Sequence, residues 1–139
     1  MNNLYLDTNL FLYLSESSSP YHQECLKLIK YCQKNKIALV TSTETIQEII
    51  HFTKNTKQLE KGLKVAQKTL QLVSELLPIN QTTIEIYLKK TSIYKTSSSR
   101  DLIHLAVCLE NKIDSVITFD KDFERFGEIK AIKPKDITD

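Results

Sequence analysis

The sequence is poor in the residues that interrupt regular structure, with 2 Gly and 3 Pro among 139 residues. So few turn residues argue against an all-β protein and favour long helices. No stretch approaches the ~18 consecutive apolar residues that a membrane-spanning helix needs. The N-terminus has neither a basic region before its apolar run nor a small-residue cleavage site. We therefore expect no signal peptide, no membrane anchor and a cytoplasmic protein.

Cysteine and histidine are also scarce. Cys25, Cys32 and Cys108 form no Cys-x-x-Cys pair, and the 3 His are scattered. A zinc site is disfavoured, because it needs such ligands at short, regular spacing. Cys25 and Cys32 are expected on one apolar helix face, as buried and reduced thiols.

What remains is the composition of a folded protein. A length of 139 residues suits one domain with a substantial core. Hydrophobic residues make up 41% and charged residues 26%, which argues against disorder. The net charge of +2 says little about partners. We interpret residues 1–139 as a single domain.

Short apolar runs alternate with longer segments of helical periodicity. Strands are predicted at residues 4–6, 37–41 and 115–119, with brief strands at 78–79 and 131–132. Helices are predicted at residues 9–14, 21–34, 44–53, 56–77, 82–90 and 100–111. This alternation predicts an α/β fold, a three-layer α/β/α sandwich with a mainly parallel central sheet.

The segment 56–77 shows two contrasting sides at helical spacing. One side is apolar and is expected to face the core, through Leu59, Leu63, Ala66, Leu70 and Val73. The other side is basic, through Lys54, Lys57, Lys61, Lys64 and Lys68. A solvated face is the ordinary explanation of such a run. The functional alternative is a stripe that binds a phosphate backbone without reading its sequence.

Four acids stand where the predicted fold would bring them together. Asp7 and Asp120 follow apolar strands, and Glu48 and Asp101 lie within apolar helix segments. Singly, each has an ordinary explanation, such as helix-dipole stabilisation or a turn. In a parallel sheet, however, strand ends and helix starts meet at one edge. A cluster of carboxylates there needs a partner or a metal ion, and without one at least one carboxyl pKa should be raised.

Four segments carry a resemblance to a known family, in this order along the chain: Asp7-Thr8-Asn9, residues 45–50, residues 100–106 and residues 116–123. Together they resemble the PIN-domain nucleases, and more narrowly the VapC-type toxins of prokaryotic toxin–antitoxin pairs. No single segment is specific, but four in order across nearly the whole chain are a strong signal.

The resemblance implies a divalent-metal-dependent endoribonuclease whose acidic quartet is Asp7, Glu48, Asp101 and Asp120. It also implies supporting roles around the quartet. Asn9 and Thr118 would orient carboxylates, Asp122 would be an extra acid, and Glu44 is the weaker competitor of Glu48.

Basic residues near these segments are the candidates for substrate binding. They are Arg100, Lys54, Lys57 and Lys61. Arg100 and His104 match a variant of the third segment of the family. We expect His104 to be a hydrogen-bonded helix residue at the rim of the pocket, ahead of any catalytic role.

The chemistry of the four acids also indicates a divalent-metal site, independently of the family resemblance. A set of oxygen ligands suits Mg²⁺ or Mn²⁺. Such ions place water in line with a phosphodiester and stabilise the leaving oxygen. Whether one or two ions bind is left open by four acids.

Partners follow from the resemblance. It implies an RNA substrate, a homodimer, and an antitoxin whose tail enters the acidic groove. The helices at 21–34 and 46–52 are candidate contact surfaces.

Other interpretations remain beside this one. A haloacid-dehalogenase-type phosphatase would need a second Asp where the chain has Asn9. A receiver domain would need a strand-end Asp within residues 36–42, and none is there. Two alternatives stay open: a PIN fold that binds RNA or protein without turnover, and an RNA-processing nuclease that is not a toxin.

Overall fold

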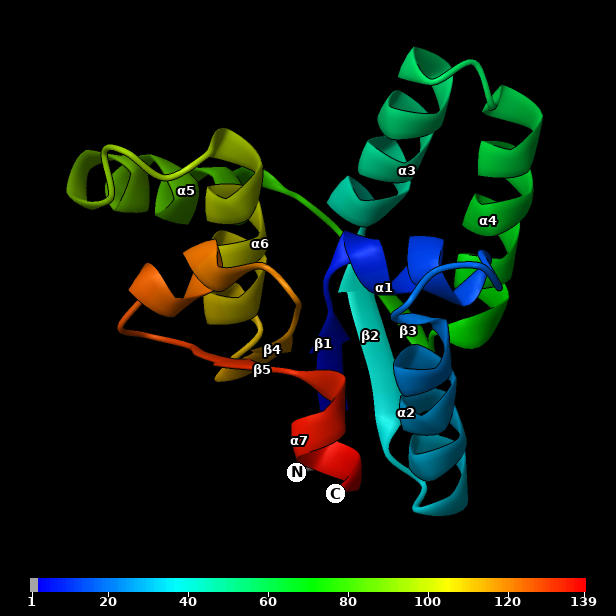
Figure 1. The fold of residues 1–139 in the computed structure, drawn as a ribbon. Coiled ribbons are helices and arrows are strands. Elements are labelled where there is room, and N and C mark those ends of the chain that lie inside the picture. The colour runs from blue at the N-terminus through cyan, green and yellow to red at the C-terminus, as the bar shows by residue number, and fades with distance from the viewer. Residues whose placement is uncertain (1–2) are drawn as a thin grey trace.

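The computed structural model describes residues 3–139 and has three layers built around a five-stranded sheet (Figure 1). The strands are β1 (Asn3–Leu6), β2 (Ala38–Ser42), β3 (Glu75–Leu77), β4 (Ser115–Ile117) and β5 (Lys130–Ile132). Their order is β3-β2-β1-β4-β5, and every neighbouring pair is parallel. The predicted α/β/α sandwich is confirmed, with parallel pairing throughout this sheet.

Strand β1 lies at the centre, and both of its faces are covered. Leu4 and Leu6 belong to one hydrophobic cluster, while Tyr5 belongs to the cluster on the opposite face. All three side chains are buried. A strand that is covered on both faces reads as a continuous apolar run, which is why this segment was recognisable in the sequence.

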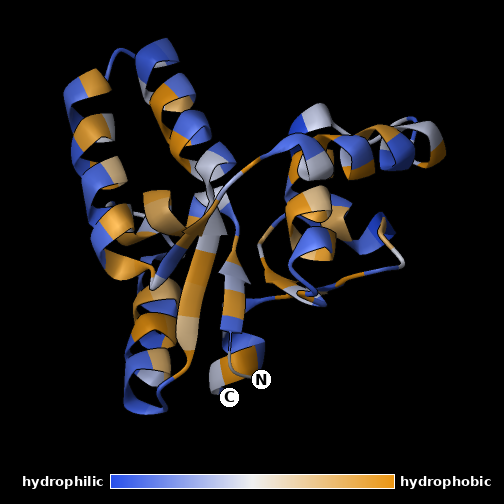
Figure 2. Ribbon diagram, turned by 180° about the vertical axis from the view of Figure 1, so that it is seen from behind, coloured by the Kyte–Doolittle hydropathy of each residue, from blue (hydrophilic) through white to orange (hydrophobic). Residues whose placement is uncertain are grey.

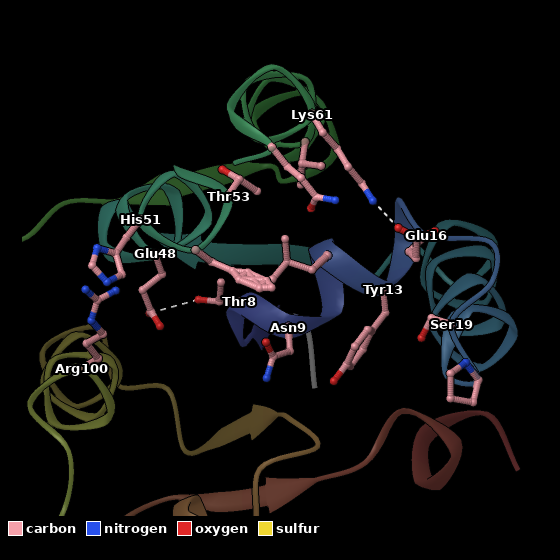
Figure 3. Close-up of a pocket in the computed structure, with 15 residues that line it drawn as sticks. Thr8, Asn9, Tyr13, Glu16, Ser19, Glu48, His51, Thr53, Lys61 and Arg100 are labelled. Carbon is pink, nitrogen blue, oxygen red and sulfur yellow. Dashed lines mark hydrogen bonds and ion pairs between the residues drawn. The ribbon is translucent and has the colours of Figure 1, made fainter. Parts of the chain in front are cut away.

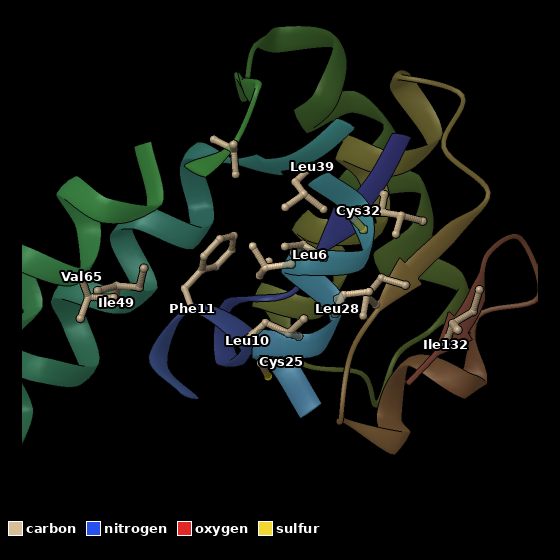
Figure 4. Packing of buried hydrophobic residues seen from close by; sticks show 14 of the residues in the cluster. Leu6, Leu10, Phe11, Cys25, Leu28, Cys32, Leu39, Ile49, Val65 and Ile132 are labelled. Carbon is tan, nitrogen blue, oxygen red and sulfur yellow. The ribbon is translucent and has the colours of Figure 1, made fainter. Parts of the chain in front are cut away.

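Helices cover both faces of the sheet. They are α1 (Thr8–Leu14), α2 (His22–Lys34), α3 (Thr43–Asn55), α4 (Leu59–Leu72), α5 (Gln81–Ile93), α6 (Ser99–Glu110) and α7 (Pro134–Thr138), with a 3₁₀ helix η1 at Lys121–Arg125. The first core cluster draws side chains from α1, α2, α3 and α4 (Figure 4). Cys25 and Cys32 are buried free thiols within it, as predicted. The second cluster draws on α6 and η1.

Helices α3 and α4 form a hairpin that extends beyond the carboxyl edge of the sheet (Figure 1). Figure 2 shows that β2 is apolar along most of its length, whereas both helices of the hairpin alternate apolar and polar residues. Two small residues allow the helices to approach closely. A Cβ atom added to Gly62 would lie 1.9 Å from Oγ1 of Thr53, and both residues are buried.

The predicted helix at 56–77 is wrong in its bounds. Helix α3 runs on to Asn55, Lys57 takes a positive φ of 58°, and α4 begins only at Leu59. Helix α4 then ends at Leu72, because the amide of Ser74 donates to the carbonyl of Leu39 at 2.8 Å and draws the chain into the sheet. Strand β3 therefore occupies residues 75–77 and not 78–79.

This break also shortens the predicted basic stripe, of which Lys61, Lys64 and Lys68 remain together on α4. Lys54 lies on α3, Lys57 lies in the turn, and Lys61 lies on α4. The three residues therefore do not share one helix face.

The predicted apolar face of α4 is only partly buried. Ala66 and Val73 are buried, but Leu59, Leu63 and Leu70 are 41%, 49% and 51% exposed. The buried face consists mainly of small residues, Gly62, Val65, Ala66 and Thr69. Because the short side chains are the ones that fit against α3, the larger leucines turn outward.

Two short helical segments were not predicted. The 3₁₀ helix η1 follows β4, and α7 follows β5, where Pro134 occupies the first helical turn. Proline suits that position because it has no amide hydrogen to leave unpaired. Within residues 3–139, no helix has the length and apolar character that a bilayer crossing requires.

The contact between Gly62 and Thr53 gives a first prediction. Gly62→Ala should force α4 away from α3 and lower the free energy of unfolding by about 1–3 kcal/mol, as overpacking typically does. Urea denaturation followed by circular dichroism measures this change. Gly127→Ala is the matched control, because its added Cβ would come no closer than 4.0 Å to Tyr94. Equal stability of the two variants would contradict the close packing of the hairpin.

Candidate functional site

The carboxyl ends of β1 and β4 place two acids side by side. The strands pair in parallel with Leu6 opposite Ile117, so Asp7 and Asp120 follow at the same edge. Asp7 caps α1, and its Oδ1 accepts a hydrogen bond from the amide of Thr8 at 2.8 Å. Asp120 caps η1, and its Oδ1 accepts from the amide of Asp122 at 2.9 Å. The two capping bonds orient both carboxylates.

Thr118 links the two strand ends. Its hydroxyl donates to Oδ2 of Asp7 at 2.8 Å and accepts from the amide of Asp120 at 2.9 Å. Both oxygens of Asp7 are thus hydrogen-bonded, one to Thr8 and one to Thr118. Asn9, which was predicted to orient carboxylates, is half-buried and lines the adjacent cavity. The residues that bond to the carboxylate of Asp7 are Thr8 and Thr118.

Three acids form a set that could hold a cation. One carboxylate oxygen from each of Asp101, Asp120 and Asp122 lies within 4.8 Å of the others. Asp101 is in the first turn of α6, while Asp120 and Asp122 come from η1 and its cap. Asp101 and Asp120 are half-buried and Asp122 is exposed. Three converging carboxylates are a donor set that fits Mg²⁺ or Mn²⁺.

Two of the acids, Asp101 and Asp7, have raised pKa values. Burial raises the pKa of Asp101 to about 6, helped by the nearby charges of Asp120 and Asp7. Burial also raises the pKa of Asp7, although the charge of His104 and the hydrogen bond from Thr118 act against it. The expectation that at least one carboxyl would have a raised pKa is met at both residues.

His104 is a hydrogen-bonded residue of α6, as predicted, but it is buried, so the predicted position at the pocket rim is wrong. Its side chain is 1% exposed, and its ring packs edge-on against Tyr5, with ring centroids 5.6 Å apart. Nε2 is hydrogen-bonded to Oε1 of Glu48 and lies 3.9 Å from Oδ1 of Asp7. Nδ1 lies 2.5 Å from the hydroxyl of Tyr5. The fold therefore gives two of the acids a shared basic partner.

The pair of His104 and Glu48 is charged. Burial favours the neutral form of both groups, but their mutual hydrogen bond and attraction outweigh it. As a result, the pKa of Glu48 is lowered and that of His104 is raised. Thr8 supports the pair, because its hydroxyl donates to the same Oε1 of Glu48 at 3.0 Å.

Glu48, and not Glu44, is the α3 acid that bonds to His104 and Thr8. Glu44 is half-buried, and burial together with the neighbouring charge of Glu48 raises its pKa. The positive charge of Arg100 acts on both acids and favours their ionised forms. Arg100 thus stands at the side of the site where α6 faces α3 (Figure 3).

A cavity of about 570 Å³ adjoins Glu48 and is lined mainly by α1, α3 and α4, with Arg100 of α6 at its side (Figure 3). Its lining includes Asn9, Tyr13, Glu48, Phe52, Lys61 and Arg100. Lys61 forms an ion pair with Glu16 within this lining. Lys54 and Lys57 are exposed and do not belong to the lining. Of the three lysines considered from the sequence, only Lys61 is beside the site.

The family follows from comparison with known proteins. The profile of the PIN domain matches residues 4–129. This match covers most of the chain, which therefore belongs to the PIN-domain family.

Within that family the chain is similar to proteins named VapC ribonucleases. It is 30% identical over 127 residues to the ribonuclease VapC13 of Mycobacterium tuberculosis, covering 91% of this chain and 97% of the relative. In fold it is similar to VapBC2 of Rickettsia felis, crystallised with a promoter DNA fragment, with a TM-score of 0.77 at 13% identity and coverage of 94% and 98%. It is also similar to VapC20 of M. tuberculosis, described as a sarcin-ricin loop cleaving toxin, with a TM-score of 0.73 at 17% identity and coverage of 91% and 97%.

The raised pKa of Asp101 gives a second prediction. The folded chain holds this proton up to about pH 6, whereas the unfolded chain releases it near its ordinary value of 3.8. Stability contributed by the protonated form is therefore lost as pH rises through this window. In EDTA, Asp101→Asn should become more stable than the wild type as pH rises from about 4 to 6. By pH 7 the gain should be about 1–2 kcal/mol, allowing for solvent screening at a half-buried site.

Chemical denaturation across this pH range measures the difference. Mn²⁺ is the control, because an ion bound to the ionised cluster stabilises the wild type more than the variant at pH 7. A difference that is flat with pH in EDTA would contradict the raised pKa.

Proposed function

We propose that this chain is a divalent-metal-dependent endoribonuclease that acts in the cytoplasm as the toxin of a toxin–antitoxin pair. The observation that carries the proposal is the convergence of Asp101 and Asp120 with Asp122, beside Asp7 and Glu48, at the carboxyl edge of a PIN-domain sheet. Membership of the PIN family and similarity to proteins named VapC ribonucleases support the reaction class.

The ion is proposed to be Mg²⁺ or Mn²⁺, because every available donor is an oxygen. Asp101, Asp120 and Asp122 would hold it, with Asp7 and Glu48 beside them. When bound, such an ion neutralises phosphate charge and lowers the pKa of water at the site.

The chain's own residues then orient the site and the RNA. Thr8 and Thr118 hold the carboxylate of Asp7 by hydrogen bonds to its two oxygens. Arg100, beside Glu48 in the cavity wall, is suited to bind a phosphate of the substrate. We propose that the substrate is unpaired RNA, since single-stranded loops are the RNA segments whose backbone enters such a cavity most readily.

The cavity also supports a proposal about the antitoxin. Several structures with this fold are VapBC complexes of toxin and antitoxin. We propose that the cognate antitoxin inserts its tail into the cavity, against Tyr13 and Phe52, with a basic side chain directed at the acids. Phe52 is 44% exposed, although it is large and apolar, as expected for a partner contact.

A homodimer is proposed on the family resemblance. Exposed apolar side chains support it, because α5 presents Ile84, Leu88 and Ile93 at exposures of 39%, 60% and 62%. Ile84 and Leu88 lie one helical turn apart, and an exposed apolar pair of this kind is typical of a surface that another chain covers.

The central prediction concerns Asp7. Asp7→Asn should lower the rate of RNA cleavage at least about 100-fold, since the charge of an acid beside the metal site is lost. The fold should remain intact, because an Asn side chain can still accept the capping bond from Thr8. Cleavage of a panel of single-stranded RNAs with Mn²⁺ or with EDTA measures the effect.

The matched control is Asp114→Asn, an exposed acid just before the amino end of β4. It should cleave as the wild type does. Cleavage that persists in EDTA or survives Asp7→Asn would contradict the proposed function. RNA binding without cleavage in any divalent metal would favour the binding module, and cleavage without antitoxin control would favour an RNA-processing nuclease.

A further prediction concerns the antitoxin. Phe52→Ala should weaken binding of the cognate antitoxin about 10-fold or more, because exposed aromatic anchors dominate such contacts. Isothermal titration calorimetry measures the affinity. Leu70→Ala is the control, since Leu70 is 51% exposed on α4 but lies outside the cavity lining. Equal losses in the two variants would mean that the tail binds elsewhere.

A further inference from the structure

His104 uses both of its ring nitrogens inside the protein. On one side, Nε2 is hydrogen-bonded to Oε1 of Glu48. On the other side, Nδ1 is 2.5 Å from the hydroxyl of Tyr5. Tyr5 is fully buried, and its hydroxyl donates onward to Oγ of Ser42 at 2.8 Å. These four residues form a continuous chain of hydrogen bonds from the centre of the sheet to the acid on α3.

The direction of these bonds is fixed by the number of protons. A tyrosine hydroxyl has one hydrogen, and Tyr5 gives it to Ser42. The bond between His104 and Tyr5 therefore uses the hydrogen on Nδ1, with the phenol oxygen as acceptor. Tyr5 thereby sets the orientation of the imidazole ring, and the ring presents Nε2 to Glu48.

The effect falls on one particular oxygen of Glu48. Both Thr8 and His104 bond to Oε1. Oε2 makes none of the hydrogen bonds found among residues 3–139. A glutamate side chain has three rotatable bonds, so an unrestrained carboxylate would lose considerable entropy on binding an ion. Anchoring one oxygen removes much of that cost and leaves the other oxygen free to act.

We propose that His104 is a positioning residue: held by Tyr5, it fixes Oε1 of Glu48 so that Oε2 is presented to the divalent ion of the site. This inference rests on the proposed metal dependence, and it adds Tyr5 and His104 to the residues on which the site depends. It assigns His104 no contact with the ion or the RNA.

A buried pair that served stability alone would predict a different pattern of effects. It would make the free energy of unfolding depend on His104 and would leave the metal affinity of the folded chain unchanged. Outer residues that orient metal ligands instead change metal affinity, typically by 10–100-fold. Metal affinity therefore separates the two roles.

The test is a set of variants titrated with Mn²⁺ by isothermal calorimetry, with circular dichroism to confirm folding. His104→Leu should weaken Mn²⁺ binding about 10–100-fold, because Oε1 of Glu48 keeps the bond from Thr8 but loses the one from His104. His104→Gln should recover most of the affinity, since its amide can donate to Oε1. Tyr5→Phe should give an intermediate loss, because it removes the acceptor that orients the ring while filling the same space.

Val107→Ala is the matched control. Val107 is fully buried on α6 in the same cluster as Tyr5, and its truncation leaves the bonds to Glu48 in place. It should lower stability but keep the Mn²⁺ affinity of the wild type.

Two results would overturn the proposal. One is wild-type Mn²⁺ affinity in folded His104→Leu, and the other is a loss in His104→Gln as large as that in His104→Leu. If the His104 variants do not fold, Tyr5→Phe decides, and unchanged affinity in that variant overturns the proposal. If the wild type binds Mn²⁺ but does not cleave RNA, the proposed function is refuted. The role of His104 is then still decided by the Mn²⁺ affinities of the variants.

Discussion

Repulsion between carboxylates is the constraint on which this structure depends. A parallel sheet brings the ends of its strands to one edge, and here the ends of β1 and β4 carry Asp7 and Asp120. Burial strengthens the repulsion, because Asp7 is only 6% exposed. The chain offsets it with fixed donors, namely the amide of Thr8, the hydroxyl of Thr118 and the ring of His104. These donors orient the acids as well as stabilising them.

The acids consequently form two groups with different surroundings. Asp7 and Glu48 lie on the inner side, where buried His104 shares its charge between them. Asp101 and Asp120 lie on the outer side and are joined by Asp122. Within the outer group, burial and the charges of Asp120 and Asp7 raise the pKa of Asp101. We expect a divalent cation to bind at the three outer acids, with the inner acids already oriented by their bonds to His104 and its neighbours.

The features that could be predicted from the sequence are those that depend on local patterns of apolar and polar residues. Asp7 and Asp120 were recognisable because each follows a short apolar run that becomes a buried strand. The break at Lys57 was not, since lysine favours helices and its positive φ has no sequence signal. The close contact of Gly62 with α3, and the burial of His104, arise from packing between segments that are distant in sequence. Neither could be obtained from periodicity.

The most direct test of the central claim is anomalous diffraction at the manganese absorption edge, from crystals of the wild-type protein equilibrated with MnCl₂. We predict a peak in contact with the carboxylate oxygens of Asp101 and Asp120, next to Asp7, and its loss in Asp101→Asn crystals. A site without manganese, or manganese only at an exposed acid such as Asp114, would contradict the claim that these carboxylates converge to bind a metal ion.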